Sequence, residues 1–579
     1  MPSIDRRTLL AGLGVAPLVH SSSFAAVRSV RPAATIDEDL LEVTVSRLQK
    51  FYAARKYTVT EVVQWYLGRI RRFNGIYRAI ETVMEEDALR AAAGADSAAG
   101  AARGPLWGVP IVIKANTCIK GRITTDGWEG YARPGHELIA SRDATVVAKL
   151  RAAGAIIIGH TNMPDFAASD TTRSTSFGRT GNAYDVRFSP GGSSGGTVTA
   201  VTGNMALLGT GTDTGNSIRM PAATSALVGV LPTRGLVSLA GIAPLDWLLD
   251  NTGPIARTVA DAAIALSVMA GEDPLDRATR QQTAQAQPET YVRNLKSGTL
   301  QGKRFAVPSF ILQGEGIPFH GIPPAVPREL AARLSAEAGI PLRSETRAAF
   351  MRDVATLRAL GATIIFDDSI LPGSFTRLAA EVCTYAYVRE GTERFLENFG
   401  PAQYRSIQAY ERSVGQPIAP IVAGAEPAFA RIGHYKISQV SIESDPNARS
   451  EYYEPRQKML NAYLEPLDRL HLDGYVYPPI QMPPPDETMP QDGRVSEGPH
   501  SLTDFANIIG VPAVVVAGGF YPDGLPYGLE FSGRPWRDGD LLQWAYAWEQ
   551  ATRHRRPPTL VTAGLLSHTP QDNSERPEG

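Results

Sequence analysis

The chain has 579 residues, of which 43% are hydrophobic and 20% charged, fractions that are ordinary for a soluble globular protein. A formal net charge of -2 and the lack of any dense run of Lys or Arg argue against nucleic acid as a partner. Two cysteines, Cys118 and Cys383, are too few for a disulfide framework or a thiolate zinc site, and a single bond between them stays open.

The N-terminus has the pattern of an export signal. Arg6 and Arg7 precede an apolar stretch that ends at Val19, and small residues follow it. This order is typical of a secretory signal, and the adjacent arginines resemble the twin-arginine signal of bacteria. The stretch is shorter than the ~20 residues that span a membrane, so no stable membrane insertion is expected. We therefore predict a signal peptide at 1–27 and export by the twin-arginine machinery to the periplasm or the medium. The alternative is a disordered N-terminus with two chance arginines.

The first regular elements are a helix and a buried strand. Residues 57–96 have apolar side chains at helical spacing, after a capping box of Thr58 and Glu61. Residues 108–113 then form an unbroken apolar run rich in β-branched side chains, which predicts a short buried strand.

A helix, a glycine and a strand follow one another twice along the chain. The first copy is a helix over 146–153, closed by Gly154, and a strand over 155–158. The second copy lies at 357–365. Units of this kind indicate alternating helices and strands around a mostly parallel sheet.

The second half also contains irregular segments. Residues 311–345 are rich in Pro and Gly and predict an excursion from the sheet, and the prolines of 478–490 predict another. A final buried strand is expected over 511–517 and a final helix over 541–551. The polar residues 569–579 are expected to be disordered.

Two segments rich in serine and glycine, 189–196 and 211–221, carry the densest chemical signal. Glycines beside a serine let a substrate approach the main chain closely. Consecutive N–H groups in such a turn can converge into a nest that binds an anion. A hydroxyl nucleophile next to donors for an oxyanion is what acyl transfer requires.

Simpler interpretations of these segments fit less well. A linker is disfavoured because the apolar residues 200–208 join the two segments, and no phosphate-loop motif is present. Ser194 fits the G-x-S-x-G nucleophile elbow, which should follow a hydrophobic strand, whereas 184–190 is polar and interrupted by proline. A Ser-His-Asp esterase of the α/β-hydrolase type that uses Ser194 stays as an alternative.

The two segments together resemble the signature of the amidase signature family. Further matching segments are 108–116, 143–147, 159–166, 252–262 and 524–528. The resemblance covers 38–555, which we take as the amidase domain, and is weakest across 311–500. It implies an α/β fold: a single large domain with a mixed central β-sheet flanked by helices on both faces.

The resemblance also implies a role for each site residue of this serine hydrolase. Ser217 matches the nucleophile, Ser193 the serine after a cis peptide bond that passes the proton on, and Lys114 the general base. The residues agree, because the apolar strand before Lys114 would lower its pKa from the usual ~10.4. The remaining matches are the oxyanion-hole N–H groups of Thr214, Gly215, Asn216 and Ser217, and the supporting side chains of Ser194, Asp213 and Arg219.

Two positions depart from the pattern of the family. Asn216 stands where the family commonly has glycine, and asparagine tolerates left-handed backbone angles, so the turn can survive although the side chain narrows the pocket. His160 stands where lysine is frequent, and we expect a supporting change there, not a new base. The nine histidines form no H-E-x-x-H motif or close His/Cys cluster, so neither a metal nor a cofactor is expected.

The expected function is therefore hydrolysis of the C–N bond of a linear carboxylic amide, with a small-molecule or peptide amide as substrate. Esters and carbamates stay open as substrates, and no oligomeric state is implied. One alternative is the catalytic subunit of a tRNA-dependent amidotransferase, a cytosolic protein against which the export signal argues. Another is a binding protein on the same scaffold, which would have lost Lys114, Ser193 or Ser217.

Overall fold

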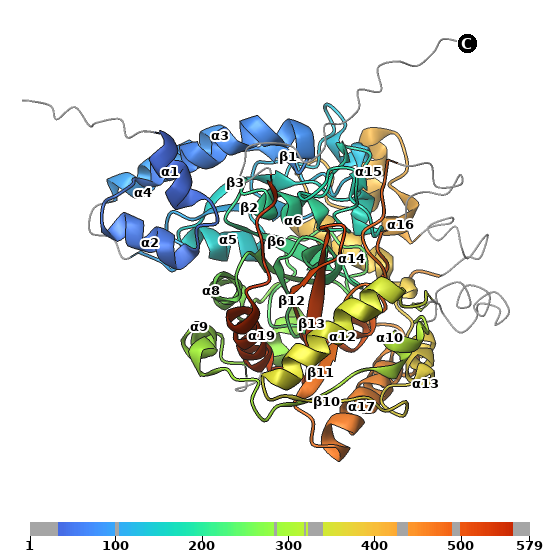
Figure 1. Ribbon diagram of the computed structural model, residues 1–579. Helices are drawn as coiled ribbons and strands as arrows, with labels where there is room; N and C mark the ends of the chain where they lie inside the picture. Colours follow the sequence, from blue (N-terminus) through green and yellow to red (C-terminus); the bar gives the residue numbers. More distant parts are fainter. Residues whose placement is uncertain are drawn as a thin grey trace, which may run out of the picture. The chain divides into compact units, whose positions relative to one another are not determined.

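One mixed sheet lies at the centre of the domain (Figure 1). It has eleven strands in the order β1-β3-β2-β6-β8-β7-β12-β13-β11-β9-β10. The computed structural model describes residues 33–98, 103–282, 286–317, 320–321, 340–424, 438–488 and 498–559. The strands are β1 Ile80–Val83, β2 Pro110–Lys114, β3 Ile156–Thr161, β4 Arg173–Ser174, β5 Gly178–Arg179, β6 Leu208–Asp213, β7 Val228–Leu231, β8 Asn251–Ala256, β9 Arg304–Ala306, β10 Thr363–Ile365, β11 Gly474–Tyr477, β12 Ala513–Phe520 and β13 Pro526–Ser532.

The strand directions divide the sheet into three parts. The pairs β3-β2 and β2-β6 are parallel, as are β11-β9 and β9-β10 at the other end. Between them, from β6 to β11, every neighbouring pair is antiparallel. The sheet is thus mixed, as the family resemblance implied, and the expectation of a mostly parallel sheet is wrong. That expectation rested on two helix-glycine-strand units, whose strands β3 and β10 are parallel to β2 and β9, whereas β1 at the edge pairs antiparallel with β3.

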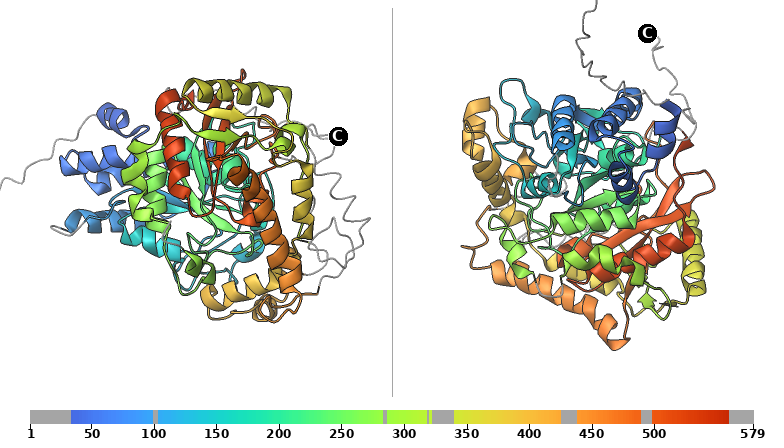
Figure 2. Two further views of the ribbon diagram at one scale, coloured as in Figure 1. Left: turned by 90° about the horizontal axis from the view of Figure 1, so that it is seen from below. Right: turned by 90° about the vertical axis from the view of Figure 1, so that its left-hand side faces the viewer.

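Helices cover both faces of the sheet, as the two views of Figure 2 show. Helices α8 and α19 contact each other and pack on β7, β8, β12 and β13. Helices α6 and α7 also contact each other; α6 packs on β2, β6 and β8, and α7 on β7, β12 and β13. The helices are α1 Ala33–Leu40, α2 Val45–Ala53, α3 Val59–Tyr77, α4 Glu85–Ser97, α5 Thr145–Ala152, α6 Gly195–Thr202, α7 Arg219–Ala223, α8 Val259–Met269, α9 Tyr291–Asn294, α10 Ser309–Gln313, α12 Ser344–Ala359, α13 Gly373–Thr376, α14 Val388–Phe399, α15 Ile407–Val414, α16 Pro420–Ala423, α17 Glu454–Arg469, α18 Phe505–Ile509 and α19 Asp538–Thr552.

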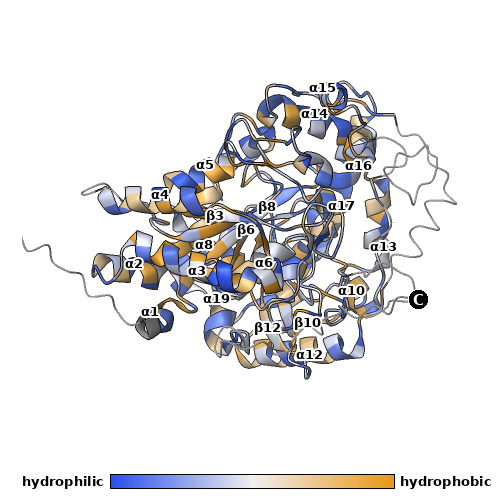
Figure 3. Cartoon of the chain, turned by 90° about the horizontal axis from the view of Figure 1, so that it is seen from above, coloured by the Kyte–Doolittle hydropathy of each residue, from blue (hydrophilic) through white to orange (hydrophobic). Residues whose placement is uncertain are grey.

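The amphipathic character of each helix follows its position. Helix α8 is apolar along most of its length, because it is covered by the sheet, α5 and α19 (Figure 3). Helix α3 is amphipathic, and its buried side carries Val62, Tyr66, Ile70 and Phe73. The described residues after Leu40 form one compact unit, a single large α/β domain, and α1 belongs to a separate unit. No helix in the described part of the chain is both long and apolar enough to cross a membrane.

Two expected elements differ from the structure. The helix predicted over 57–96 is two helices, α3 and α4, with strand β1 between them. The break occurs at Arg78, which has a left-handed conformation and caps α3, and the β-branched residues of β1 then pair with β3. The strand predicted as the last, β12, is followed by β13, with which it pairs antiparallel.

The other expected elements are present. The strand predicted over 108–113 is β2, and both helix-glycine-strand units form, as α5 with β3 and as α12 with β10. The glycines between them, Gly154 and Gly361, have positive φ angles of 91° and 88°. Residues 478–488 contain no helix or strand, whereas the 311–345 excursion includes the ends of α10 and α12. The segments 1–27, 322–339, 489–490 and 569–579 lie outside the described residues.

Candidate active site

The sheet brings the first two elements of the site to one edge. Strand β2 ends at Lys114, and its parallel neighbour β6 ends at Asp213, so both carboxyl ends lie at the same side of the sheet. The loop after β6 carries Ser217, and the loop before α6 carries Ser193. Because α6 packs on both strands, its N-terminal end can bring Ser193 to Lys114.

Lys114 is completely buried and contacts two hydroxyl groups. Its Nζ lies 2.6 Å from Ser193 Oγ and 2.8 Å from Thr212 Oγ1, and it is 3.4 Å from the carbonyl oxygen of Thr212. Burial lowers the pKa of Lys114 to about 7, although nearby carboxylates oppose the shift. A substantial fraction of the amine is therefore neutral near neutral pH and can accept a proton from a hydroxyl group.

Ser193 is also completely buried, and the peptide bond between Gly192 and Ser193 is cis. The main chain passes very close to the segment before it, because a Cβ atom on Gly192 would lie 2.4 Å from the carbonyl oxygen of Thr171. Only glycine fits at this point. This close passage helps to hold Ser193 at the distance from Lys114 given above.

Ser217 lies in the loop between β6 and α7 and is 7% exposed, whereas Lys114 and Ser193 are fully covered. Its hydroxyl group donates no hydrogen bond to any described residue, so it is available for attack. The backbone N–H groups of Thr214, Gly215, Asn216 and Ser217 donate none to the described residues either. Four successive donors of this kind beside a hydroxyl group can stabilise an oxyanion.

Ser194 has a different environment. Its hydroxyl group donates to the carbonyl oxygen of Thr212 at 3.2 Å, and its N–H donates to the carbonyl oxygen of Ser217. It is fully buried, and no strand precedes it directly, as a nucleophile elbow would require. These contacts join the two serine segments. Among the described residues, no histidine forms a hydrogen bond with Ser194.

A buried ion-pair network holds the loop that carries Ser217. Asp213 accepts from the N–H of Ile218 at 2.8 Å and pairs with Arg219, whose Nη1 also lies 2.9 Å from Glu530 on β13. Arg219 further donates to the carbonyl oxygen of Gly215 and to the side chain of Asn507. Burial works against the charge of Arg219, yet Asp213 and Glu530 raise its pKa above the usual value.

The sequence did not predict several of these partners. Thr212 contacts Lys114 but stands inside the signature as an ordinary strand residue. Asn507 and Glu530 are 288 and 311 positions away from Arg219. The matching segment 524–528 ends just before Glu530 and is the one local signal for this region.

The two departures from the family pattern are accommodated in different ways. Asn216 has no positive φ angle, so the left-handed conformation considered for it is not needed, and its Nδ2 donates to Asp170 at 3.3 Å. His160, on β3, donates from Nε2 to the carbonyl oxygen of Thr117 at 3.0 Å. Burial lowers the pKa of His160 to about 4, so the ring is neutral. No hydrogen bond joins its ring to Lys114, Ser193 or Ser217.

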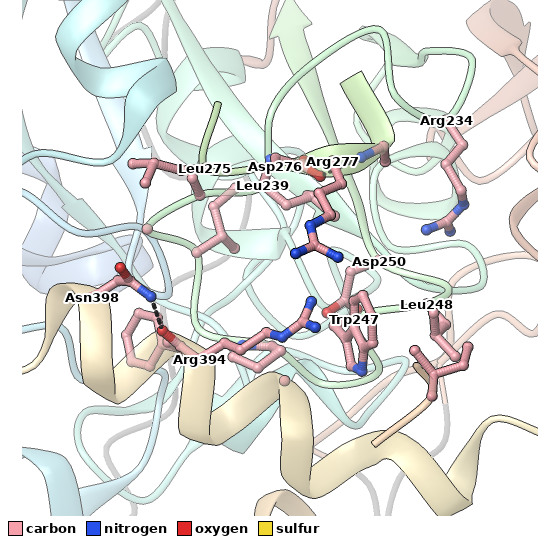
Figure 4. Close-up of a pocket in the computed structure, with 18 of the residues that line it drawn as sticks. Arg234, Leu239, Trp247, Leu248, Asp250, Leu275, Asp276, Arg277, Arg394 and Asn398 are labelled. Atoms are coloured by element: carbon pink, nitrogen blue, oxygen red, sulfur yellow. Dashed lines mark hydrogen bonds between the residues drawn. The ribbon is translucent and has the colours of Figure 1, made fainter. Parts of the chain in front are cut away.

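A cavity of about 650 Å³ lies between the residues around Asp250, Arg277 and Asn398 (Figure 4). Its lining includes Trp247, Asp250, Arg277 and Arg394, and the two arginines point into it. Asp250 accepts a hydrogen bond from Thr214 Oγ1 at 2.6 Å, which connects the cavity wall to the loop that carries Ser217. Lys114, Ser193 and Ser217 do not line this cavity.

Both cysteines, Cys118 and Cys383, are buried and unbonded. Within the described ranges no group of three or more His, Cys, Asp or Glu side chains could hold a metal ion.

Comparison with known proteins gives two kinds of relative. The chain is 32% identical to the A subunit of the glutamyl-tRNA(Gln) amidotransferase of Alkaliphilus metalliredigens, over 88% of this chain and 96% of that protein. It is also 32% identical to the corresponding protein of Symbiobacterium thermophilum, over 90% and 99%. Among solved structures it resembles the peptide amidase of Stenotrophomonas maltophilia, with 28% identity, a TM-score of 0.70, and coverage of 91% and 99%.

These relatives contradict the exported location predicted from the N-terminus. The amidotransferase subunits are of the class considered above as a cytosolic alternative, and they match most of this chain. The prediction of export is therefore wrong. Arg6 and Arg7 with a short apolar stretch form a pattern of few residues that also arises without a signal function, and they lie outside the described residues.

The Amidase family model matches residues 61–318 and 328–542. These ranges include Lys114, both serine segments and the partners of Arg219, and the sheet has the architecture of the peptide amidase. The chain therefore belongs to the amidase family and is an enzyme that acts on carbon–nitrogen bonds of amides.

Proposed function

We propose that the chain hydrolyses a small-molecule or peptide amide through an acyl-enzyme on Ser217, with Ser193 as proton bridge and Lys114 as general base. The observation that carries the proposal is the fully buried contact of 2.6 Å between Lys114 Nζ and Ser193 Oγ. A neutral amine at this distance can take the hydroxyl proton of Ser193, which in turn takes the proton of Ser217. No cofactor enters this scheme.

The proton transfers of the proposed reaction run through Ser217, Ser193 and Lys114. Ser217 Oγ attacks the amide carbon as its proton passes to Ser193 and the proton of Ser193 passes to Lys114. The N–H groups of Thr214 to Ser217 stabilise the resulting oxyanion. Lys114 then returns the proton through Ser193 to the leaving nitrogen, and the C–N bond breaks. Water then attacks the acyl carbon as its proton passes through Ser193 to Lys114, and a proton returns through Ser193 to Ser217 Oγ as the acyl–oxygen bond breaks. Ser194, Asp213 and Arg219 hold the two loops in place.

A second candidate is the catalytic subunit of an amidotransferase that acts on glutamyl-tRNA(Gln). The 32% identity over nearly all of that relative supports it, and the argument from export no longer weighs against it. Ammonia release by the purified chain from a panel of amides, including peptide amides and glutamine, separates the two. A hydrolase acts alone, whereas the catalytic part of an amidotransferase would act on glutamine and respond to added glutamyl-tRNA and the remaining subunits.

The proposed base predicts a defined pH dependence. Because burial lowers the pKa of Lys114 to about 7, kcat/KM should decline tenfold for each pH unit well below that value. The reason is that the protonated amine cannot accept a proton. Initial rates measured on a stable amide across the acid range check this. A value of kcat/KM that stays constant from about pH 8 to about pH 5 would show that Lys114 is not the general base.

Thr212 should matter although it transfers no proton. Its hydroxyl group accepts from Lys114 Nζ at 2.8 Å and from Asn116 Nδ2 at 3.0 Å, which directs the remaining face of the amine toward Ser193. Thr212→Val keeps the shape of the side chain and removes the hydroxyl group. We expect kcat/KM to fall roughly tenfold to a hundredfold, which corresponds to the free energy of one hydrogen bond to a charged group. Thr212→Ser restores the hydroxyl group and should recover most of the rate. Equal rates for the valine and serine variants would contradict this role.

A further inference from the structure

A carboxyl group that the relay does not use lies against the loop of Ser217. It belongs to Asp504, the residue directly before helix α18. A Cβ atom on Gly215 would lie 3.2 Å from both Cγ and Oδ1 of Asp504. Gly215 is one of the four successive residues whose N–H groups donate to no described residue. The carboxyl group therefore lies directly beside the candidate oxyanion hole.

This carboxyl group has no partner of its own. Neither oxygen of Asp504 accepts a hydrogen bond from another residue that the structure describes, and Oδ1 is completely buried. The residue as a whole is partly exposed. A buried carboxyl oxygen without a donor destabilises a fold, so its position beside the site calls for an explanation.

The neighbours of Asp504 hold it firmly in this position. The carbonyl oxygen of Thr503 accepts from Arg219 Nη1 at 3.1 Å, and Asn507 Oδ1 accepts from Arg219 Nη2 at 2.8 Å. Arg219 also donates to the carbonyl oxygen of Gly215. One buried arginine thus anchors both the segment of Asp504 and the loop against which its carboxyl group lies.

The charge of Asp504 has no cation beside it. Arg219 forms ion pairs with Asp213 and Glu530 and none with Asp504. Burial raises the pKa of Asp504 to about 6, and the charge of Arg219 opposes the rise, so the group is mostly a carboxylate at neutral pH. A negative charge here disfavours an oxyanion at the N–H group of Gly215, unless a cation lies next to the carboxylate when substrate is bound.

Two further acids lie at the neighbouring loop residues, but both have partners. Asp250 accepts from Thr214 Oγ1 at 2.6 Å. On the other side, Asp170 accepts from Asn216 Nδ2 at 3.3 Å. Among these three acids only the carboxyl group of Asp504 is left without a donor in the described part of the chain. It is therefore the one that can take a hydrogen bond from a ligand.

We propose that Asp504 is a specificity-determining residue whose carboxylate binds an ammonium group of the substrate. This inference rests on the proposed function and names its substrate class. Because Asp504 lies against the oxyanion-hole loop, the ammonium group must be close to the scissile carbonyl, as the α-ammonium group of an amino acid amide is. The bound cation supplies the donor that Oδ1 lacks and offsets the negative charge beside the oxyanion.

Two amides that differ only in the α-ammonium group test this directly. Phenylalaninamide has the group and hydrocinnamamide lacks it. Each is added at about pH 7, below the usual pKa of an α-amino group of ~7.7–8, while a serine-directed phosphonylating reagent labels Ser217. A bound amide protects Ser217, whether or not it is hydrolysed. Phenylalaninamide should protect at a concentration roughly tenfold to a hundredfold lower, the effect of one hydrogen bond between charged groups.

Asp504→Asn keeps the shape of the side chain and removes its charge. The two amides should then protect at similar concentrations, whereas the rate of phosphonylation without amide should stay close to that of the wild type. A merely structural role would instead slow phosphonylation and weaken both amides equally. Asp504→Ala should remove the preference in the same way and serves if the first variant fails to fold.

Asp261→Asn is the matched control. Asp261 is another buried acid whose pKa burial raises to about 6, but it lies on α8 and accepts from the N–H of Val45 at 2.9 Å. Its replacement should leave the preference for phenylalaninamide unchanged. Equal protection by the two amides, protection by neither, or an undiminished preference in both Asp504 variants would overturn the inference. Failure of the reagent to label Ser217 in the wild type would instead contradict the proposed function, so the two failures are distinguishable.

Discussion

Ser217→Ala is expected to abolish amide hydrolysis. Its hydroxyl group lies in the loop whose four successive N–H groups donate to no described residue. Ser217 is also the one member of the relay that is not completely covered, with 7% exposure, so it is expected to be the nucleophile. Loss of one member of such a unit lowers kcat by roughly 10⁴–10⁶. Ammonia release under single-turnover and steady-state conditions measures the loss, and near-wild-type turnover by this variant would refute the acyl-enzyme.

Ser194→Ala serves as the control for this experiment. Ser194 is the neighbouring serine of the same motif, but its hydroxyl group is bonded to the carbonyl oxygen of Thr212 and is fully buried. Its loss should lower the rate far less than the loss of Ser217. Because relay members act as one unit, Lys114→Ala and Ser193→Ala should each be severely impaired, and the double variant should be little worse than either.

The second large effect concerns stability. Arg219→Met should destabilise the fold by about 3–5 kcal/mol, because it leaves two buried carboxyl groups, those of Asp213 and Glu530, without their cation. The side chains of all three residues are completely buried in the structure. The loop of Ser217 would also lose the bond from Arg219 to the carbonyl oxygen of Gly215, so activity should fall with stability.

Urea unfolding of wild type and variant measures this effect. Arg449→Met is the matched control, because the Arg449–Glu454 pair is exposed, with 85% and 58% of the side chains accessible. Ion pairs of that kind contribute little, so its unfolding midpoint should hardly move. Similar midpoints for the Arg219 and Arg449 variants would show that the buried network does not hold the loop.

The sequence was informative where function depends on contiguous residues. Lys114, Ser193 and Ser217 stand in short motifs, and the structure places Lys114 against Ser193 as that pattern implied. Partners that come from elsewhere in the fold have no such motif. Asn507 stands on the short helix α18 outside any motif, and Glu530 reaches Arg219 only because β13 joins the sheet.

The fold shows the same limit. Helical spacing continues across residues 57–96 and conceals β1, whose four residues acquire strand character only by pairing with β3. Strand β13 was not predicted, because its first residues were recognised only as a motif of the family. The motif does not show that they pair with β12. Tertiary pairing, which local periodicity does not encode, decided both cases.

The most direct test of the account is to identify the serine that becomes acylated. The enzyme is treated with a serine-directed phosphonylating reagent, digested, and the labelled residue is located by fragmentation in a mass spectrometer. The account predicts label on Ser217, absent from Ser217→Ala and greatly slowed in Lys114→Ala. Label on Ser194, together with an active Lys114→Ala enzyme, would contradict it.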